Sequence, residues 1–446
     1  MNNTRISPTR HRRPLVKASL VLIAVLGVVG CSGSENSASP TDSAAEVPEV
    51  SPPISEPTAT TTTTDATPDV TSPTGTDAPA GNQLLPDDAL LVFQRGGIRV
   101  SDATGDSEVE VVPDHPDSEH PDWSPDGLSI LFDTEFSTIW SVPSEGGDVE
   151  ELVTCVAPCA NLYEGAWSPD GAQIAYAMAE TQDGTNTARS SIQVLDLATG
   201  ASRSVYENTS GTVWLFTPRW SPDGRLLAFT SYKNGRPVVY LRNLLTGKER
   251  EVAAFPGLNM CGSFSPDSKK LLLTLSKDGN EEIYSLNVET MKLTRLTNNY
   301  AIDVSPAWSP DGGKIVFVSN RSGTPQIFIM DAGGQNVNRV TFKGNYNTSP
   351  SWSPRGDRIA YEGLIDRKYQ IFTVDTEGNN PTQLTFDEAD NEYPSWSPSG
   401  RQIVYSSRRG SKTRICIMNA NGQNMRILLG DQNGLAMPSW SPRMSR

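Results

Sequence analysis

Histidine is scarce in this chain, and its scarcity limits the chemistry that the protein can perform. Three histidines occur among the 446 residues, and they are His11, His115 and His120. A Ser-His-Asp nucleophile system needs an imidazole base, so it would depend on His115 or His120. The sequence also lacks a Gly-x-Ser-x-Gly elbow, a phosphate-binding loop and a His-Glu-x-x-His zinc helix. Two interpretations remain open for the segment from His115 to His120, namely a metal-ligating segment and a solvated loop.

Long apolar runs are absent except near the N-terminus. Ala18–Val29 is an almost unbroken apolar run of 12 residues that follows five basic residues. It is too short to span a bilayer comfortably, so it predicts an export signal. The run ends Val28-Val29-Gly30-Cys31, which resembles the lipobox of bacterial lipoproteins. The resemblance implies cleavage before Cys31 and acylation of that residue, which would hold the mature protein on a membrane. The alternative is an ordinary signal peptide with an incidental cysteine.

Aromatic residues are missing from Ser32–Asn82, which is rich in Ser, Thr, Pro, Ala and Asp. This composition buries too little apolar surface to offset the entropy of ordering, so it predicts a disordered tether. We therefore divide the chain into a signal peptide (1–30), a lipidated cysteine with its tether (31–82) and a folded domain (83–446).

Basic residues are outnumbered by acidic ones, and the formal net charge is −15. An acidic surface repels nucleic-acid phosphates and anionic lipid headgroups, so we expect neither as a partner. The charge favours solubility, cations or basic partners, and we expect a monomer.

The most informative feature is a motif, Trp-Ser-Pro-Asp-Gly or a close variant, that recurs eight times. Successive copies are 44 residues apart, except for one interval of 53 residues. The surplus fits a polar insertion around 180–190. A strand-rich period of about 40–50 residues is typical of β-propeller blades. The repeat anchors are Trp123, Trp167, Trp220, Phe264, Trp308, Trp352, Trp396 and Trp440.

One unit shows how a repeat would fold. Ser309-Pro310-Asp311-Gly312 has the composition of a type I turn. The segments after it predict strands at 314–319, 326–330 and 338–341, and the next unit begins with a strand at 349–353. Four short antiparallel strands with two apolar faces are unstable alone, so neighbouring sheets must stack around an axis.

The two chain ends are expected to complete the ring. Eight anchors enclose seven complete units, and the N-terminal piece adds three strands at 89–93, 98–101 and 109–112. The segment 438–441 supplies the missing fourth strand. We predict an all-β, eight-bladed propeller whose last blade is shared by both ends, which removes exposed sheet edges. The alternative is seven blades with a stray terminal segment.

The repeated WSPDG, followed by IVFVS, a polar turn, IFIMD and RVT, resembles the repeat of TolB-type β-propellers. The resemblance covers residues 123–443 clearly and 88–122 in part. The motif is strong evidence for the fold and weak evidence for the function. TolB is a soluble periplasmic partner of an outer-membrane lipoprotein, with an α/β domain before a six-bladed propeller. This chain has a tether and more blades instead, so that particular partner is not carried over. Similar repeats precede α/β-hydrolase peptidase domains, but we expect no such domain after the last repeat.

Variation within the motif indicates that the motif has a structural role and not a chemical one. The aspartate is replaced in the units of Trp352 and Trp396, whereas the proline is always kept. We therefore expect the anchor side chains to pack between blades.

The remaining cysteines fit an exported protein. Cys155 and Cys159 lie in one connecting loop and are a candidate disulfide. Cys261 and Cys416 are three blades apart, so we expect two buried, unpaired thiols.

The channel mouth is the expected place for a ligand, because propellers bind with the loops at the channel ends. The connections before the anchors are rich in acids in four consecutive units and in aromatics in the other four. We predict a mouth that suits a cationic peptide, an amine-bearing glycan or a divalent cation such as calcium. The alternative is that the acids serve solubility and the aromatics fill gaps. The candidate residues are Asp114, Glu119, His120, Glu164, Trp214, Tyr300, Tyr346, Asp387, Glu388, Asp390 and Glu392.

The leading functional hypothesis is a lipid-anchored binding or scaffold module on the outer face of a bacterial membrane. It would engage an envelope protein or a wall polymer without a cofactor or a catalytic residue. The rival hypothesis is a glycan hydrolase or lyase, since two carboxylates about 5–10 Å apart suffice for glycoside cleavage. A third is a sensor or assembly factor whose output lies in another polypeptide.

Overall fold

The computed structural model describes residues 91–94, 97–102, 108–113, 118–134, 136–181, 187–208, 218–233, 235–433 and 438–442. Within these ranges the secondary structure is entirely β, and no helix is present that could cross a membrane. The predicted signal peptide, Cys31 and the predicted tether lie outside the described residues.

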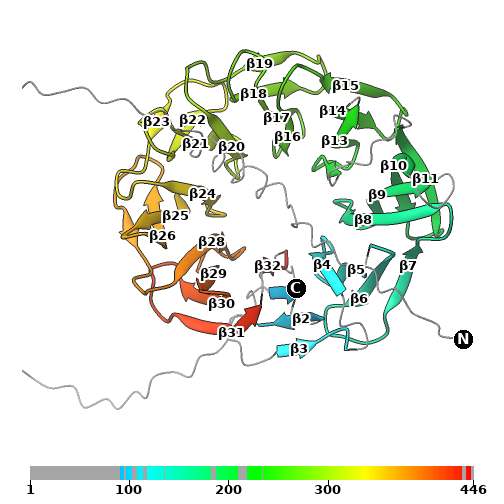
Figure 1. Cartoon of the computed structure of the whole chain (residues 1–446), viewed down its shortest axis with the longest axis horizontal. Helices are drawn as coiled ribbons and strands as arrows, with labels where there is room; N and C mark the ends of the chain where they lie inside the picture. Colours follow the sequence, from blue (N-terminus) through cyan, green and yellow to red (C-terminus); the bar gives the residue numbers. More distant parts are fainter. Residues whose placement is uncertain are drawn as a thin grey trace, which may run out of the picture. The chain divides into compact units, whose positions relative to one another are not determined.

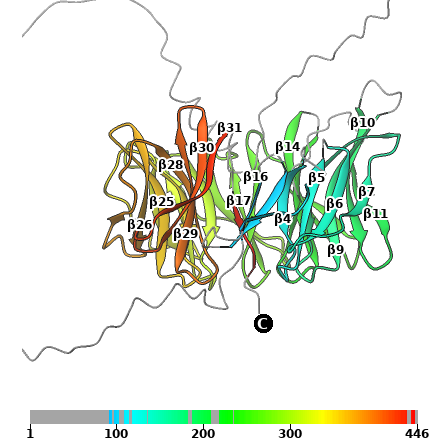
Figure 2. The ribbon, with the colours of Figure 1, turned by 90° about the horizontal axis from the view of Figure 1, so that it is seen from below.

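The described residues form eight four-stranded antiparallel sheets around a central axis (Figure 1). In each sheet the first strand lies nearest the axis and the fourth lies at the rim. The view from the side shows the strands running between the two ends of the ring (Figure 2). The predicted eight-bladed propeller is confirmed, and the seven-bladed alternative is wrong.

The blades are numbered from the first complete sheet. Blade 1 contains β4 (Ser118–Trp123), β5 (Ser129–Thr134), β6 (Thr138–Pro143) and β7 (Glu150–Thr154). Blade 2 contains β8 (Cys159–Trp167), β9 (Gln173–Thr181), β10 (Thr187–Asp196) and β11 (Ala201–Asn208). Blade 3 contains β12 (Arg219–Trp220), β13 (Leu226–Lys233), β14 (Arg236–Asn243) and β15 (Glu249–Ala253). Blade 4 contains β16 (Asn259–Phe264), β17 (Lys270–Leu275), β18 (Glu282–Asn287) and β19 (Leu293–Arg295).

The remaining blades follow the same order. Blade 5 contains β20 (Asp303–Trp308), β21 (Lys314–Ser319), β22 (Gln326–Asp331) and β23 (Asn338–Arg339). Blade 6 contains β24 (Asn347–Trp352), β25 (Arg358–Ile365), β26 (Lys368–Asp375) and β27 (Thr382–Gln383). Blade 7 contains β28 (Asp390–Trp396), β29 (Gln402–Arg409), β30 (Lys412–Asn419) and β31 (Arg426–Asn433). Blade 8 contains β32 (Ser439–Trp440), β1 (Leu91–Gln94), β2 (Ile98–Ser101) and β3 (Glu108–Glu110).

The recurring motif forms the turn between the first two strands of a blade. In blade 5 the Gly312 N–H donates to the Ser309 carbonyl at 2.9 Å. The Ser309 hydroxyl donates to Asp311 at 2.6 Å and accepts the Lys314 N–H at 2.9 Å. In blade 6, where arginine replaces the aspartate, Asp357 accepts the equivalent serine hydroxyl at 2.5 Å. The turn therefore persists without the aspartate of the motif.

Alternating apolar residues let each blade pack on both neighbours. In β21, Ile315 and Phe317 pack against Leu272 of blade 4, whereas Val316 packs against Ile359 of blade 6. Side chains of a strand alternate between the two faces of its sheet, so one short apolar run serves two interfaces. This explains why the run IVFVS is apolar on both faces.

The anchor tryptophans tie each first strand to the preceding blade. Six of them donate their indole N–H to the carbonyl of the residue just before the preceding anchor, at 3.0 to 3.2 Å. Trp308, for example, donates to Ser263. The Phe264 side chain has no N–H to donate, and the Trp167 indole N–H has no partner among the described residues.

Both chain ends share blade 8, as predicted. Leu91 and Val92 of β1 pair with Trp440 and Ser439 of β32. The Trp440 indole donates to Ser395 of blade 7, and the Trp123 indole donates to Ser439. These bonds close the ring on both sides of β32.

One detail differs from the sequence-based expectation. The fourth strands are shorter than predicted, because a threonine side chain replaces part of the ladder: the Ile327 N–H donates to the Thr341 hydroxyl at 3.0 Å. The surplus of blade 2 lies between two strands around 180–190, as expected, and lengthens the hairpin of β9 and β10, whose tip lies outside the described residues.

We predict that deleting residues 438–446 lowers the melting temperature on the order of 5 °C, because the deletion removes β32 and the buried contacts of Trp440. Differential scanning calorimetry measures the shift. Deleting residues 443–446 alone is the matched control and should leave the melting temperature unchanged. Equal melting temperatures for both deletions would contradict closure by the C-terminal strand.

Candidate functional site

Two kinds of loop meet at one end of the ring. In an antiparallel meander, the connection into each first strand lies at the same end as the turn between the second and third strands. The predicted mouth residues belong to the connections and to the beginnings of the first strands. The turns contribute a second set of side chains beside them, which the sequence-based prediction did not include.

The structure places the predicted mouth residues in three groups. Asp114 and Trp214 lie outside the described residues, as do the side chains of Glu119 and Glu164, whose backbones belong to β4 and β8. Tyr300 is 91% exposed, and Asp387 and Glu388 are also exposed. The members that come together are Tyr346, Asp390 and Glu392, at the junction of blades 6 and 7.

Three half-buried tyrosines form the centre of this junction, and we call Tyr346, Tyr369 and Tyr393 the tyrosine cluster. The rings of Tyr346 and Tyr369 meet edge to face with centroids 6.3 Å apart. Burial and the nearby Glu362 raise the pKa of all three phenols, to about 12 for Tyr369 and Tyr393. The phenols are therefore neutral hydrogen-bonding groups at physiological pH.

Glu362 of β25 lies beneath the tyrosine cluster with its carboxylate fully engaged. Its side chain accepts the hydroxyls of Thr348 and Ser349 at 2.8 Å each, and the Tyr393 backbone N–H at 3.0 Å. Glu362 is only 4% exposed, and this burial raises its pKa. The carboxylate thus fastens the first strand of blade 6 to that of blade 7.

Ser349 and Tyr393 occupy equivalent places in their blades, three residues before the anchor. Both lie at an irregular point of the first strand and have positive φ, 53° and 57°. His120 and Ser305 share this position and this backbone conformation, with φ of 52° and 55°. Bulges in an edge strand redirect a side chain and often accompany binding sites. We call these residues the bulge positions.

Blade 1 repeats the arrangement of a carboxylate beneath a bulge position. The His120 Nδ1 lies 2.9 Å from Asp133, which is almost fully buried in β5. Asp133 and Glu362 are each ten residues after their anchors. The repeat therefore places an acid at the same height in two blades of the ring.

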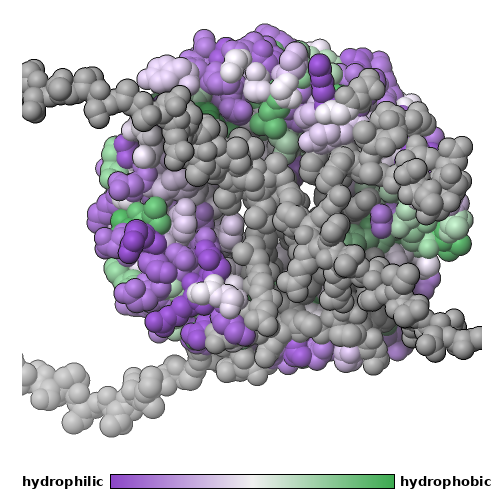
Figure 3. All heavy atoms as spheres, viewed as in Figure 1, coloured by the Kyte–Doolittle hydropathy of each residue, from purple (hydrophilic) through white to green (hydrophobic). Residues whose placement is uncertain are grey.

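Basic residues at the strand ends beside the turns offset the predicted acids of blade 7. Asp390 lies 3.6 Å from both the Lys368 amine and the Arg408 guanidinium, and the Arg408 Nε donates to Glu392 at 3.2 Å. Burial nevertheless raises the pKa of Glu392 above its ordinary value. This part of the mouth is therefore a charge-paired, aromatic surface rather than a simple acidic one. Figure 3 shows the same side of the ring as Figure 1, with hydrophilic residues predominating over blades 6 and 7.

Four residues of this junction were not predicted from the sequence, namely Glu362, Tyr369, Tyr393 and Arg408. A visible signal existed for Glu362, because the buried strand Arg358–Ile365 places an acid where β21 has Val318 and β29 has Ser406. Arg408 lies directly opposite Asp390 in the hairpin of β28 and β29, so the register of that hairpin was the signal for it.

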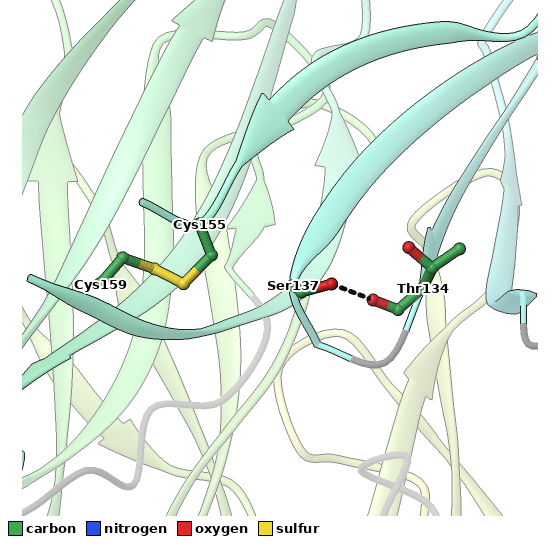
Figure 4. The surroundings of a disulfide bond; sticks show 4 residues. All are labelled: Thr134, Ser137, Cys155 and Cys159. Carbon is green, nitrogen blue, oxygen red and sulfur yellow. Dashed lines mark hydrogen bonds between the residues drawn. A yellow bond between two sulfur atoms is a disulfide. The ribbon is translucent and has the colours of Figure 1, made fainter. Parts of the chain in front are cut away.

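The cysteines of the connection between blades 1 and 2 are joined. Cys155 and Cys159 form a disulfide with a Cα–Cα distance of 5.2 Å (Figure 4). Cys155 also donates its N–H to the Ser137 carbonyl at 2.8 Å. Cys416 is buried and unpaired, but Cys261 is of intermediate exposure rather than buried. Burial raises the pKa of both thiols to about 11, so both are poor nucleophiles.

Possible metal ligands are scattered over the described part of the ring. Within the described part of the chain, His, Cys, Asp and Glu side chains do not gather in groups of three or more that could hold a metal ion. Calcium binding by the exposed Asp387 and Glu388 therefore remains a prediction.

We predict that lowering the pH from about 7.5 to about 5 increases the stability of the wild type relative to a Glu362→Gln variant. A raised folded-state pKa means that the folded protein binds the proton more readily than the unfolded chain does. The penalty of burying the charge is present above the folded pKa and is relieved as the pH falls through it. Urea unfolding followed by tryptophan fluorescence measures the difference. Glu289→Gln, at an exposed position of blade 4, is the control, and a pH-independent difference for Glu362→Gln would contradict the prediction.

Comparisons with known proteins agree with the repeat architecture. The family described as the TolB β-propeller domain (PD40) matches residues 182–444. The Tol-Pal system protein TolB of Hahella chejuensis is 37% identical over 87 residues, which is 20% of this chain and 19% of that protein. The protein of the same name from Chromobacterium violaceum is 37% identical over 68 residues, 15% of each chain. The chain therefore spans about a fifth or less of the length of these relatives.

A likeness to solved structures extends to the fold alone. Dipeptidyl peptidase 4 of Porphyromonas gingivalis gives a TM-score of 0.56 at 13% identity, over 76% of this chain and 57% of that one. The family match covers more than half of the chain, and it falls on the stacked four-stranded repeats described above. The chain belongs to the TolB β-propeller domain family.

Proposed function

We propose that the protein is a cell-envelope binding module that holds a partner protein or a wall polymer at the tyrosine cluster and carries out no reaction. The relatives bear the name of the Tol-Pal system, and a propeller of the same family supports a scaffold role in the same setting. The cluster is the single observation that carries the proposal for this chain.

The tyrosine cluster has the properties of an energetic centre for binding. Tyrosine offers a large, rigid contact area with two side-chain torsions and a hydroxyl at its edge, so little entropy is lost when it is covered. Tyr346, Tyr369 and Tyr393 are held by separate elements of two blades, which fixes their relative positions. The charges around them are paired within the chain, so a partner does not have to neutralise an isolated charge.

The engaged carboxylates weigh against the rival hypothesis of a glycan hydrolase or lyase. Both oxygens of Glu362 accept hydrogen bonds from the chain, and Glu392 pairs with Arg408. A general acid or base must reach the proton that it transfers. Glu362 is occupied as a structural link between two first strands, which supports binding over catalysis.

The proposal places the propeller on the outer face of a bacterial membrane through acylated Cys31. Its support is the basic head, the apolar run and the small residues before the cysteine. The tether after Cys31 would then allow the ring to reach a partner at some distance from the membrane.

We predict that Tyr369→Ala and Tyr393→Ala each reduce capture of the principal partner about tenfold or more, because each substitution removes a central aromatic contact. The measurement is crosslinking in living cells, followed by mass spectrometry of what is captured. Tyr300→Ala is the matched control, since Tyr300 is a fully exposed aromatic on the connection between blades 4 and 5. Equal capture by all three variants, with circular dichroism confirming that each is folded, would rule out the cluster as the binding centre.

We predict that Cys31→Ser moves the protein from the membrane fraction to the soluble fraction, because no thiol remains for acylation. Cell fractionation with immunoblotting measures the distribution. Ser32→Ala is the control and should stay with the membrane. A Cys31→Ser variant that remains with the membrane would contradict lipid anchoring without affecting the proposed binding surface.

A further inference from the structure

A concave feature lies at the junction of blades 3 and 4, away from the tyrosine cluster. It is a hollow of about 350 Å³ between the turn that joins β13 to β14 and the connection that leads into β16. We call it the blade 3–4 hollow. Its lining combines apolar side chains with Lys233, Arg236 and Glu251. Neither the family match nor the proposed function accounts for it.

The apolar part of the hollow is held in place by a buried side chain. Phe255 lines it, together with Pro237, Val238 and Ala254. Asn259, which is completely buried, accepts the Phe255 N–H at 3.2 Å and donates to the Phe255 carbonyl at 2.7 Å. The floor under a ligand is therefore ordered before binding, which lowers the entropy cost of association.

Cationic groups surround this floor. The Lys233 amine pairs with Glu251 at 2.5 Å, and the Lys277 amine lies 5.4 Å from the centroid of the Phe255 ring. The Arg236 side chain is exposed on the lining and makes no hydrogen bond or ion pair within the described part of the chain. The lining thus has two cations and one anion, in a protein whose net charge is −15.

We propose that the blade 3–4 hollow binds a carboxylate attached to an apolar group, the chemistry of the C-terminal residue of a peptide. The Arg236 guanidinium presents parallel N–H donors that match the two oxygens of a carboxylate. The apolar side chain next to that carboxylate packs on Phe255 and Val238. The cations of the lining attract an anion locally, although the acidic protein as a whole repels anions.

The test uses two probes that differ in one group, N-acetyl-leucine and N-acetyl-leucinamide. The purified protein should bind the acid with a dissociation constant in the millimolar range that is typical of so small a ligand, and it should bind the amide about tenfold more weakly or worse. Saturation-transfer NMR titration measures both affinities. A free carboxylic acid and a peptide C-terminus share this chemistry, so a tetrapeptide ending in leucine is compared with its C-terminal amide. Tighter binding of the peptide than of N-acetyl-leucine identifies a peptide as the ligand.

Two substitutions locate the binding. Arg236→Gln should weaken the acid about tenfold and the amide little, because it removes the charged partner of the carboxylate. Lys248→Gln removes an exposed cation at the opposite end of blade 3 and should change neither affinity. Equal affinities for acid and amide, an Arg236→Gln variant that binds like the wild type, or no binding of either probe at millimolar concentration would each overturn the proposal. None of these results bears on the tyrosine cluster.

Discussion

The indole N–H of the anchor tryptophan is the interaction on which the ring depends. It joins the first strand of one blade to a backbone carbonyl of the blade before it, at six junctions within the described residues. At these six junctions the donor is the anchor and the acceptor precedes the previous anchor, so the blades that they join are set in the same register. Phe264 packs against the neighbouring blade but cannot make the indole hydrogen bond, so packing of the apolar faces alone stabilises that junction.

Constant register also explains why the tyrosine cluster exists. Residues from β24, β25, β26 and β28 meet at one place because neighbouring blades repeat the same heights along their strands. Glu362 then reaches a hydroxyl of its own blade and a backbone N–H of the next. The strand ends beside the turns of the same blades bring Lys368 and Arg408 to the acids of blade 7. Charge pairing at this junction combines contacts within blade 7, from Arg408 to the two acids, with one contact between blades, from Lys368 to Asp390.

The sequence predicted the fold well because the relevant information is local and repeated. Spacing, turn composition and alternation fixed the blade number, the order of strands and the shared last blade. The candidate site was predicted in part: Tyr346, Asp390 and Glu392 come together, whereas Tyr300 is isolated and exposed. Pairing between blades, such as Lys368 of blade 6 with Asp390 of blade 7, involves residues of different hairpins. No local pattern encodes that pairing, so the mouth was expected to be more acidic than it is.

At the bulge positions the backbone conformation is constant while the side chain varies. His120, Ser305, Ser349 and Tyr393 differ in size, charge and hydrogen-bonding capacity, yet all adopt one backbone conformation on the innermost strand. The surrounding turns, anchors and apolar faces do not depend on which side chain stands there. Divergence within such a family can therefore alter what the centre of the ring accepts by single replacements, leaving folding intact. The same property makes these sites the natural places to re-engineer the selectivity of an eight-bladed scaffold.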